Sequence, residues 1–121
     1  VCYEIAYPLQ VAELEADLLQ TVSNDAWFGD TLGPHQHFEI ARMRALENGR
    51  SLLRATNTGI SAIVDGRGRV LERLPQFQRA VLRGQVPLYS GRTPFAASGG
   101  LPVFVLMALM LSWAWRGRAR S

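Results

Sequence analysis

The chain has 121 residues, which is enough for one domain with its own core, and 48% of them are hydrophobic. Its 13 basic residues are all arginine and outnumber 10 acidic residues, which gives a formal net charge of +3. Arg116, Arg118 and Arg120 crowd into the C-terminal end, so the rest of the chain is neutral and has no basic stripe. A neutral body argues against a nucleic-acid partner.

The first half of the chain alternates strand and helix patterns. The Asn48-Gly49 pair is a good helix stop, and Pro34 suits the first turn of a helix because its missing N–H would have no partner there. The spacing of apolar residues predicts the end of a strand over 1–5, an amphipathic helix over 11–17, a buried strand over 18–22 and a helix over 35–48.

The second half begins with strand patterns. Strands are predicted over 52–57 and 60–64, and the turn at 65–68 leads into a further strand over 70–74 as a hairpin. Residues 80–86 alternate loosely and are a candidate for one more strand. Strand, helix, strand, helix and then a hairpin indicate an α/β layered fold.

The composition changes abruptly near the end of the chain. A linker rich in Pro, Ser, Gly and Thr covers 87–98, and residues 99–115 form an apolar run without charge. We expect this run to be a transmembrane helix, in preference to a buried core helix or an amphipathic surface helix, with Trp113 and Trp115 as interfacial aromatics. The basic tail, 116–121, would then be cytoplasmic and the α/β body would lie on the other side of the membrane.

Cys2 is the only cysteine of the chain, and it precedes Tyr3 and Glu4 at the predicted end of a strand. A thiol there is either a nucleophile or a small buried apolar group. A nucleophile needs a neighbouring base or cation, and His35 and His37 are generic candidates, with plain surface residues as the alternative. Two histidines without nearby cysteines are weak evidence of a metal site, so no metal and no cofactor is expected.

Four segments together resemble one known group of enzymes, the nitrilase superfamily of carbon–nitrogen hydrolases. The order and spacing of these segments match that superfamily across residues 1–86. Within it, the apolar terminal run and the residues around Trp27 resemble the apolipoprotein N-acyltransferase branch. The four segments are Cys2-Tyr3-Glu4 followed by Pro8, Asn24-Asp25-Ala26-Trp27, the helix segment 41–48, and Thr56-Asn57-Thr58-Gly59.

The resemblance implies a fold and a division of the chain. The fold would be the C-terminal half of a nitrilase-type αββα sandwich followed by one transmembrane helix. The parts would be the C-terminal part of the catalytic domain over 1–86, the linker over 87–98, the transmembrane helix over 99–115 and the cytoplasmic tail over 116–121.

The resemblance also implies roles for individual residues. Cys2 matches the nucleophile of a Glu-Lys-Cys triad, whose glutamate and lysine would lie upstream of residue 1. The backbone N–H of Tyr3 would stabilise the oxyanion, and Glu4 would be a supporting carboxylate. A substrate-binding role or plain structural packing are the two alternatives for three loop residues, Asn24, Asp25 and Trp27.

The implied activity is an N-acyl transfer at a bacterial inner membrane, with the catalytic domain on the outer, periplasmic side. A fatty acyl chain would pass from a membrane phospholipid to the Cys2 thiol, and from there to the N-terminal α-amine of a diacylglyceryl-cysteine on an apolipoprotein. Two alternatives stay open. One is a soluble amidase or nitrilase that hydrolyses its thioester, and the other is a membrane-anchored, non-catalytic interaction module.

Overall fold

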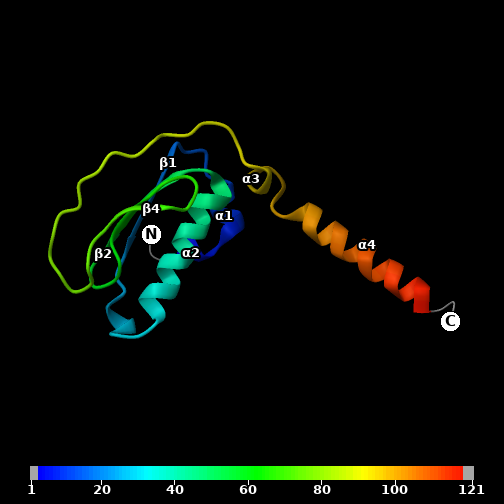
Figure 1. The fold of residues 1–121 in the computed structure, drawn as a ribbon, viewed down its shortest axis with the longest axis horizontal. Helices are drawn as coiled ribbons and strands as arrows, with labels where there is room; N and C mark the ends of the chain where they lie inside the picture. The colour runs from blue at the N-terminus through cyan, green and yellow to red at the C-terminus, as the bar shows by residue number, and fades with distance from the viewer. Residues whose placement is uncertain (1–2, 119–121) are drawn as a thin grey trace.

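The computed structural model describes residues 3–118, so Cys2 lies outside the described residues, as do residues 119–121. The body is a mixed α/β fold built on a four-stranded sheet in the order β1-β2-β3-β4 (Figure 1). Strands β1 (Leu18–Ser23) and β2 (Ser51–Thr56) are parallel, whereas β3 (Ala62–Val64) and β4 (Val70–Arg73) continue the sheet antiparallel. All four predicted strands from residue 18 to residue 74 are confirmed.

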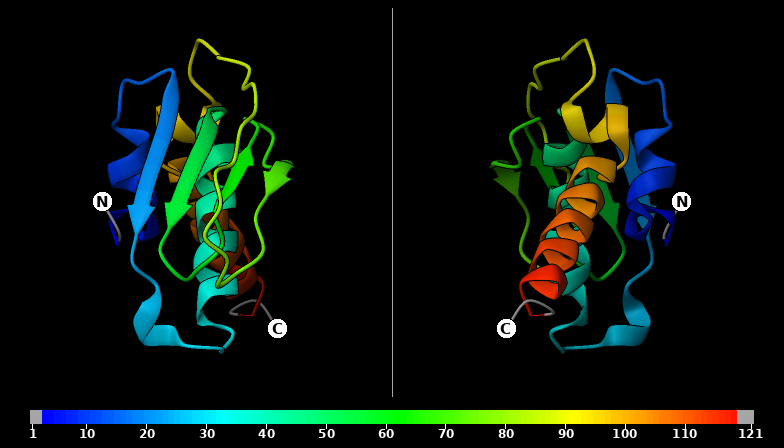
Figure 2. Two further views of the ribbon diagram at one scale, coloured as in Figure 1. Left: turned by 90° about the vertical axis from the view of Figure 1, so that its left-hand side faces the viewer. Right: turned by 90° about the vertical axis from the view of Figure 1, so that its right-hand side faces the viewer.

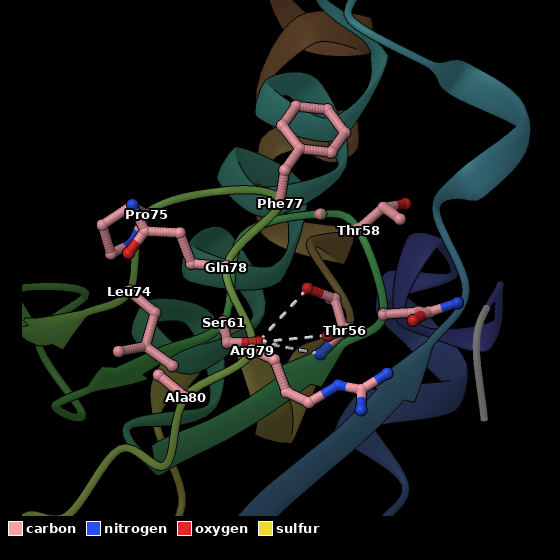
Figure 3. Close-up of a pocket in the computed structure, with 11 residues that line it drawn as sticks. Thr56, Thr58, Ser61, Leu74, Pro75, Phe77, Gln78, Arg79 and Ala80 are labelled. Carbon is pink, nitrogen blue, oxygen red and sulfur yellow. Dashed lines mark hydrogen bonds between the residues drawn. The ribbon is translucent and has the colours of Figure 1, made fainter.

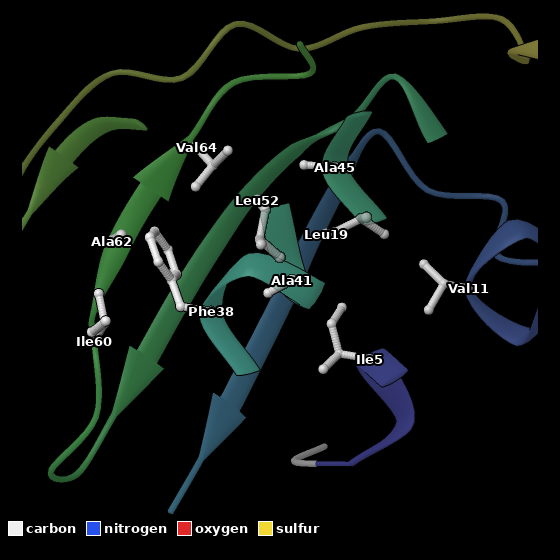
Figure 4. Packing of buried hydrophobic residues seen from close by; sticks show 10 residues of the cluster. All are labelled: Ile5, Val11, Leu19, Phe38, Ala41, Ala45, Leu52, Ile60, Ala62 and Val64. Atoms are coloured by element: carbon white, nitrogen blue, oxygen red, sulfur yellow. The ribbon is translucent and has the colours of Figure 1, made fainter. Parts of the chain in front are cut away.

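Helix α2 (Gly33–Asn48) connects the two parallel strands and lies along one face of the sheet (Figure 2). It ends where the sequence predicted, because Gly49 adopts the left-handed conformation, φ 60°, that closes a helix. Between helix and sheet lies the core, which Figure 4 shows from close by. The core cluster consists of Ile5, Val11, Leu19, Phe38, Ala41, Ala45, Leu52, Ile60, Ala62 and Val64.

The N-terminal segment differs from the prediction. Residues 4–6 form a short 3-10 helix, η1 (Glu4–Ala6), where the sequence predicted a strand over 1–5. Helix α1 (Pro8–Ala12) starts at Pro8 and ends near the point where the predicted helix over 11–17 was to begin. Pro8 accounts for the shift, because its fixed φ favours the first turn of a helix. Ile5 and Val11 nevertheless reach the core from these two turns.

The chain after β4 runs without a strand to residue 93, so the candidate strand over 80–86 is wrong. A short helix, α3 (Pro94–Ser98), lies inside the predicted linker over 87–98. The Thr93 side chain caps α3, because its hydroxyl oxygen accepts a hydrogen bond of 3.0 Å from the backbone N–H of Ala96. The linker is therefore partly structured and returns the chain to the end of α2.

Helix α4 (Leu101–Arg118) projects away from the body, and none of its residues is buried (Figure 1). The apolar run is thus helical, as predicted. Among residues 3–118, however, no helix combines the length and the apolar character that crossing a membrane requires. The predicted span over 99–115 is corrected on this point. Helix α4 starts only at Leu101, and its apolar part, 101–115, rises about 22 Å at 1.5 Å per residue, short of a hydrocarbon core of about 30 Å.

Candidate functional site

The candidate site lies where the two parallel strands end. Strands β1 and β2 run in the same direction, so their carboxyl ends, Ser23 and Thr56, are paired at one edge of the sheet. Ligands of open α/β sheets bind in crevices at this edge. The loop after β1 carries η2 (Ala26–Phe28), and the loop after β2 carries Asn57, Thr58 and Gly59.

Asp25 is the centre of a buried polar cluster at this edge, with an exposed fraction of only 1%. One carboxylate oxygen accepts a hydrogen bond from the Ser23 hydroxyl at 3.0 Å and lies 3.0 Å from Nδ1 of His37. The other carboxylate oxygen accepts a hydrogen bond of 2.9 Å from the Arg54 guanidinium, whose side chain is fully buried. A buried carboxylate requires such partners, since an unpaired charge in the interior is strongly unfavourable.

The two contacts of His37 Nδ1 decide its tautomer. Nδ1 lies 3.0 Å from the Asp25 carboxylate and 3.1 Å from the Arg54 guanidinium, and it can serve only one of them as a hydrogen-bond partner. Donation to the carboxylate is favoured because it is charge-assisted, whereas acceptance from Arg54 would set the Nδ1 lone pair against that carboxylate. We infer that Nδ1 carries the proton.

The cluster also holds the loop after β2. The Arg54 Nε–H donates to the Ile60 carbonyl at 3.2 Å. Gly59 lies so close to Asp25 that a Cβ on residue 59 would stand 2.1 Å from the carboxylate, far inside van der Waals contact. A glycine is required at this position, and it lets the 57–59 loop pack directly against the buried carboxylate.

The predicted site residues are only partly brought together. Glu4 is exposed at the start of η1, and Tyr3 is exposed just before it. The Tyr3 ring makes an edge-to-face contact with Tyr7 at 5.8 Å between centroids. Asn24 accepts a hydrogen bond from the backbone N–H of Ala26 at 3.2 Å and so shapes the turn after β1. Cys2 lies outside the described residues, so the catalytic roles of Cys2, Tyr3 and Glu4 stay predictions.

Of the other predicted loop residues, Asp25 is buried while Trp27 has 82% of its surface exposed. Asp25 therefore packs within the fold and Trp27 stands in solvent beside the same edge, and the substrate-binding role of both stays a prediction. The histidines separate similarly, because His35 is exposed and His37 is buried against Asp25. The plain surface reading holds for His35 and is wrong for His37.

The sequence reasoning did not single out Arg54 as part of the site. A signal was available, because Leu52 and Arg54 are two residues apart on one strand and therefore share a face. An arginine on the core face of a strand needs a buried carboxylate, and Asp25 at the end of the neighbouring parallel strand satisfies that requirement.

A pocket of about 410 Å³ adjoins the cluster on the side of the 57–59 loop (Figure 3). One wall is the end of β2 and the following loop, in which Ser61 and Thr56 hydrogen-bond to each other, with 3.0 Å between the Thr56 N–H and the Ser61 hydroxyl. The opposite wall is the segment after β4. The lining residues are Thr56, Asn57, Thr58, Gly59, Ser61, Leu74, Pro75, Phe77, Gln78, Arg79 and Ala80.

Within residues 3–118 there is no group of three or more His, Cys, Asp or Glu side chains that could hold a metal ion. The described cluster at the sheet edge instead pairs one carboxylate with a guanidinium cation and an imidazole. Its chemistry is that of an internal ion pair, which orients the loops around the pocket.

Comparison with known proteins shows which family has this arrangement. Residues 1–93 match the family model described as carbon–nitrogen hydrolase. Proteins named apolipoprotein N-acyltransferase are similar over nearly the whole chain: that of Azotobacter vinelandii is 53% identical over 94% of this chain, and that of Vibrio vulnificus is 46% identical over 100%. The chain spans only 22% and 24% of the length of these two relatives. The chain belongs to the carbon–nitrogen hydrolase family.

Proposed function

We propose that the protein is an N-acyltransferase of lipoprotein maturation. It would move a fatty acyl chain from a membrane phospholipid to the N-terminal α-amine of the diacylglyceryl-cysteine of an apolipoprotein. The observation that carries the proposal is the similarity itself: relatives named apolipoprotein N-acyltransferase match 94–100% of this chain at 46–53% identity. The carbon–nitrogen hydrolase model matches residues 1–93, which include Cys2, Tyr3 and Glu4.

The proposed reaction has two steps. In the first, the Cys2 thiolate attacks an ester carbonyl of the phospholipid, a thioester forms, and a lysophospholipid leaves. In the second, the acceptor amine attacks the thioester, an amide forms, and the thiolate is regenerated. The Tyr3 backbone N–H is proposed to stabilise the oxyanion of both steps, which for one such donor is worth about 3 kcal/mol. Glu4 is proposed to support the site with its carboxylate.

The lysine of the triad is proposed to come from outside the 121 residues, since the sequence contains no lysine, and the glutamate base is proposed to accompany it there. Trp27 is proposed to bind substrate in this scheme, because its large aromatic ring, exposed beside the sheet edge, offers an apolar surface to an acyl chain. Asn24 and Asp25 are proposed to set the position of the loop that carries Trp27, through the turn at Ala26 and the buried ion pair respectively.

The membrane is the proposed partner of α4. A helix that is apolar on all sides and carries no buried residue exposes an unfavourable surface to water. Contact with lipid would remove that surface from water and would bring the site to its lipid substrates. We place the protein at a bacterial inner membrane, with the α/β body at its outer face.

The test is intact-protein mass spectrometry of the full-length protein after incubation with phospholipid vesicles. We expect one fatty acyl adduct on Cys2, absent in Cys2→Ala, that disappears when a diacylglyceryl-cysteine peptide is added and reappears as an amide on that peptide. An adduct that is lost to water alone would favour the hydrolase. A protein that never acquires an adduct would be the non-catalytic module, and the proposal would be wrong.

A further inference from the structure

The pocket in Figure 3 has the chemistry of an anion site. Arg79 is its only charged residue among the described residues, and no carboxylate lines it. Within residues 3–118, no ion pair or hydrogen bond engages the Arg79 side chain, in contrast to Arg54, which pairs with Asp25 and donates to the Ile60 carbonyl. A guanidinium presents five N–H donors in a planar fork that matches carboxylate and phosphate oxygens.

The wall facing Arg79 adds neutral hydrogen-bonding groups. Asn57 and Thr58 bring an amide and a hydroxyl from the loop after β2. Gln78 brings a second amide from the wall that carries Arg79 itself. The Asn57–Gly59 loop is held from behind by the buried cluster, because Asp25 packs against Gly59 and Arg54 donates to the Ile60 carbonyl. The backbone of this loop is therefore set in place before a ligand binds, which lowers the entropic cost of binding.

The other half of the pocket is apolar. Leu74, Pro75 and Ala80 line it, and Phe77 stands at its rim with 60% of its surface exposed. Phe77 is also the one residue other than glycine with a positive φ, 61°, within the described part of the chain. Such backbone strain is characteristic of ligand clamps. A pocket with an arginine at one side and apolar side chains at the other fits an amphiphile whose anionic group is next to hydrocarbon.

We propose that this pocket binds the phosphate group of the acyl-donor phospholipid, with Arg79 as its charged ligand and the apolar wall against the adjoining glycerol and first chain methylenes. The proposal rests on the proposed function, because it assigns a subsite for the donor of that reaction. It makes Arg79 a specificity-determining residue: the enzyme would distinguish a phospholipid from an uncharged diacylglycerol at this position.

The experiment measures binding separately from chemistry. The full-length protein carrying Cys2→Ala is titrated in detergent with a short-chain phosphatidylglycerol, with the matching diacylglycerol and with inorganic phosphate, and heats are followed by calorimetry. Arg79→Gln is expected to weaken phosphatidylglycerol binding about tenfold, the size of one lost charge-assisted hydrogen bond, and to leave diacylglycerol binding unchanged. Arg79→Lys, which keeps the charge but not the fork, is expected to restore part of the affinity.

Arg67→Gln is the matched control, since Arg67 is an exposed arginine in the hairpin turn and does not line the pocket. An equal effect of Arg67→Gln and Arg79→Gln would overturn the proposal. So would inorganic phosphate binding that requires Arg79 while phosphatidylglycerol binding does not, because the site would then serve a free anion. Thioester formation by the Cys2-containing protein is scored independently, so failure of the subsite and failure of the acyl transfer give different results.

Discussion

At the scale of single residues, the buried pair of Asp25 and Arg54 explains why two loops from different strands hold one position. Each charge would be unfavourable alone, and each has the other at 2.9 Å. Ser23 and His37 also contact the Asp25 carboxylate, and the Arg54 Nε–H donates to the Ile60 carbonyl. The consequence for function is indirect, because the pair shapes the sheet edge without itself facing the pocket.

Asp25→Asn removes the charge and keeps the shape, so it leaves Arg54 buried without a counter-charge. We expect the free energy of unfolding to fall by about 3–5 kcal/mol, the usual result of breaking a buried ion pair. Hydrogen exchange of the β1 and β2 amides in the full-length protein measures the loss. Asp30→Asn is the same chemical change at an exposed position of the same loop and should have little effect. Equal protection in the two variants would contradict the prediction.

At the scale of elements, α2 carries two ion pairs of the same spacing in different surroundings. Arg42 and Glu39 meet at 2.9 Å in solvent, whereas Arg44 and Glu47 meet at 3.0 Å with both side chains largely buried. Burial raises the pKa of Glu47 above its ordinary value of 4.5, and the nearby Arg44 only partly offsets this. The folded protein therefore holds the Glu47 proton more tightly than the unfolded chain does, so stability falls as the pH rises from about 4.5 through the raised pKa.

Glu47→Gln makes this position neutral at every pH. We expect the variant to be at least as stable as the parent at neutral pH and to lose part of the decline in stability above pH 4.5. Thermal unfolding of the full-length protein as a function of pH measures both effects. Glu39→Gln alters the exposed pair instead and should lower stability by no more than about 1 kcal/mol. A larger loss of stability at neutral pH for Glu47→Gln than for Glu39→Gln would contradict the prediction. It would show that the ion pair with Arg44 stabilises the fold by more than the burial of the Glu47 charge destabilises it.

At the scale of the whole molecule, the α/β body and α4 differ in where their apolar side chains lie. The body buries an ordinary core, whereas α4, which projects from it (Figure 1), exposes large apolar side chains from Leu101 to Trp115. Lipid is the proposed solvent for that helix, and Trp113 and Trp115 near its basic end are suited to the boundary between hydrocarbon and headgroups.

Bromine-labelled phospholipids quench tryptophan fluorescence on contact and so test this placement. In the full-length protein, we expect Trp113→Phe together with Trp115→Phe to remove a quenched component, because the two rings lie at the lipid surface. Unlabelled phospholipid is the control, since it carries no quencher. Trp27→Phe reports separately on the acyl-chain contact proposed for Trp27 in the body. Quenching that is unaffected by the double replacement would place α4 away from lipid and would overturn its proposed partner.

The local patterns of the sequence determined most of the secondary structure. The four strands between residues 18 and 74, the helix that ends at Gly49 and the terminal apolar helix all follow from periodicity and stop signals, which act over a few residues. The errors over 1–17 lie where segments are short and where packing against α2, which is distant in sequence, outweighs local preference. The family could also be recognised from segment order alone.

Only the tertiary structure decided what the polar residues do. Asp25, His37 and Arg54 are separated by 12 to 29 positions, and no spacing rule joins them until two parallel strands and a crossover helix bring their ends together. The same holds for the pocket, which forms where the loop after β2 meets the segment after β4. The pattern of residues along a chain indicates which face of its own helix or strand a residue occupies. Charge pairs and cavities depend on which helices, strands and loops pack against one another, and only the tertiary structure determines that.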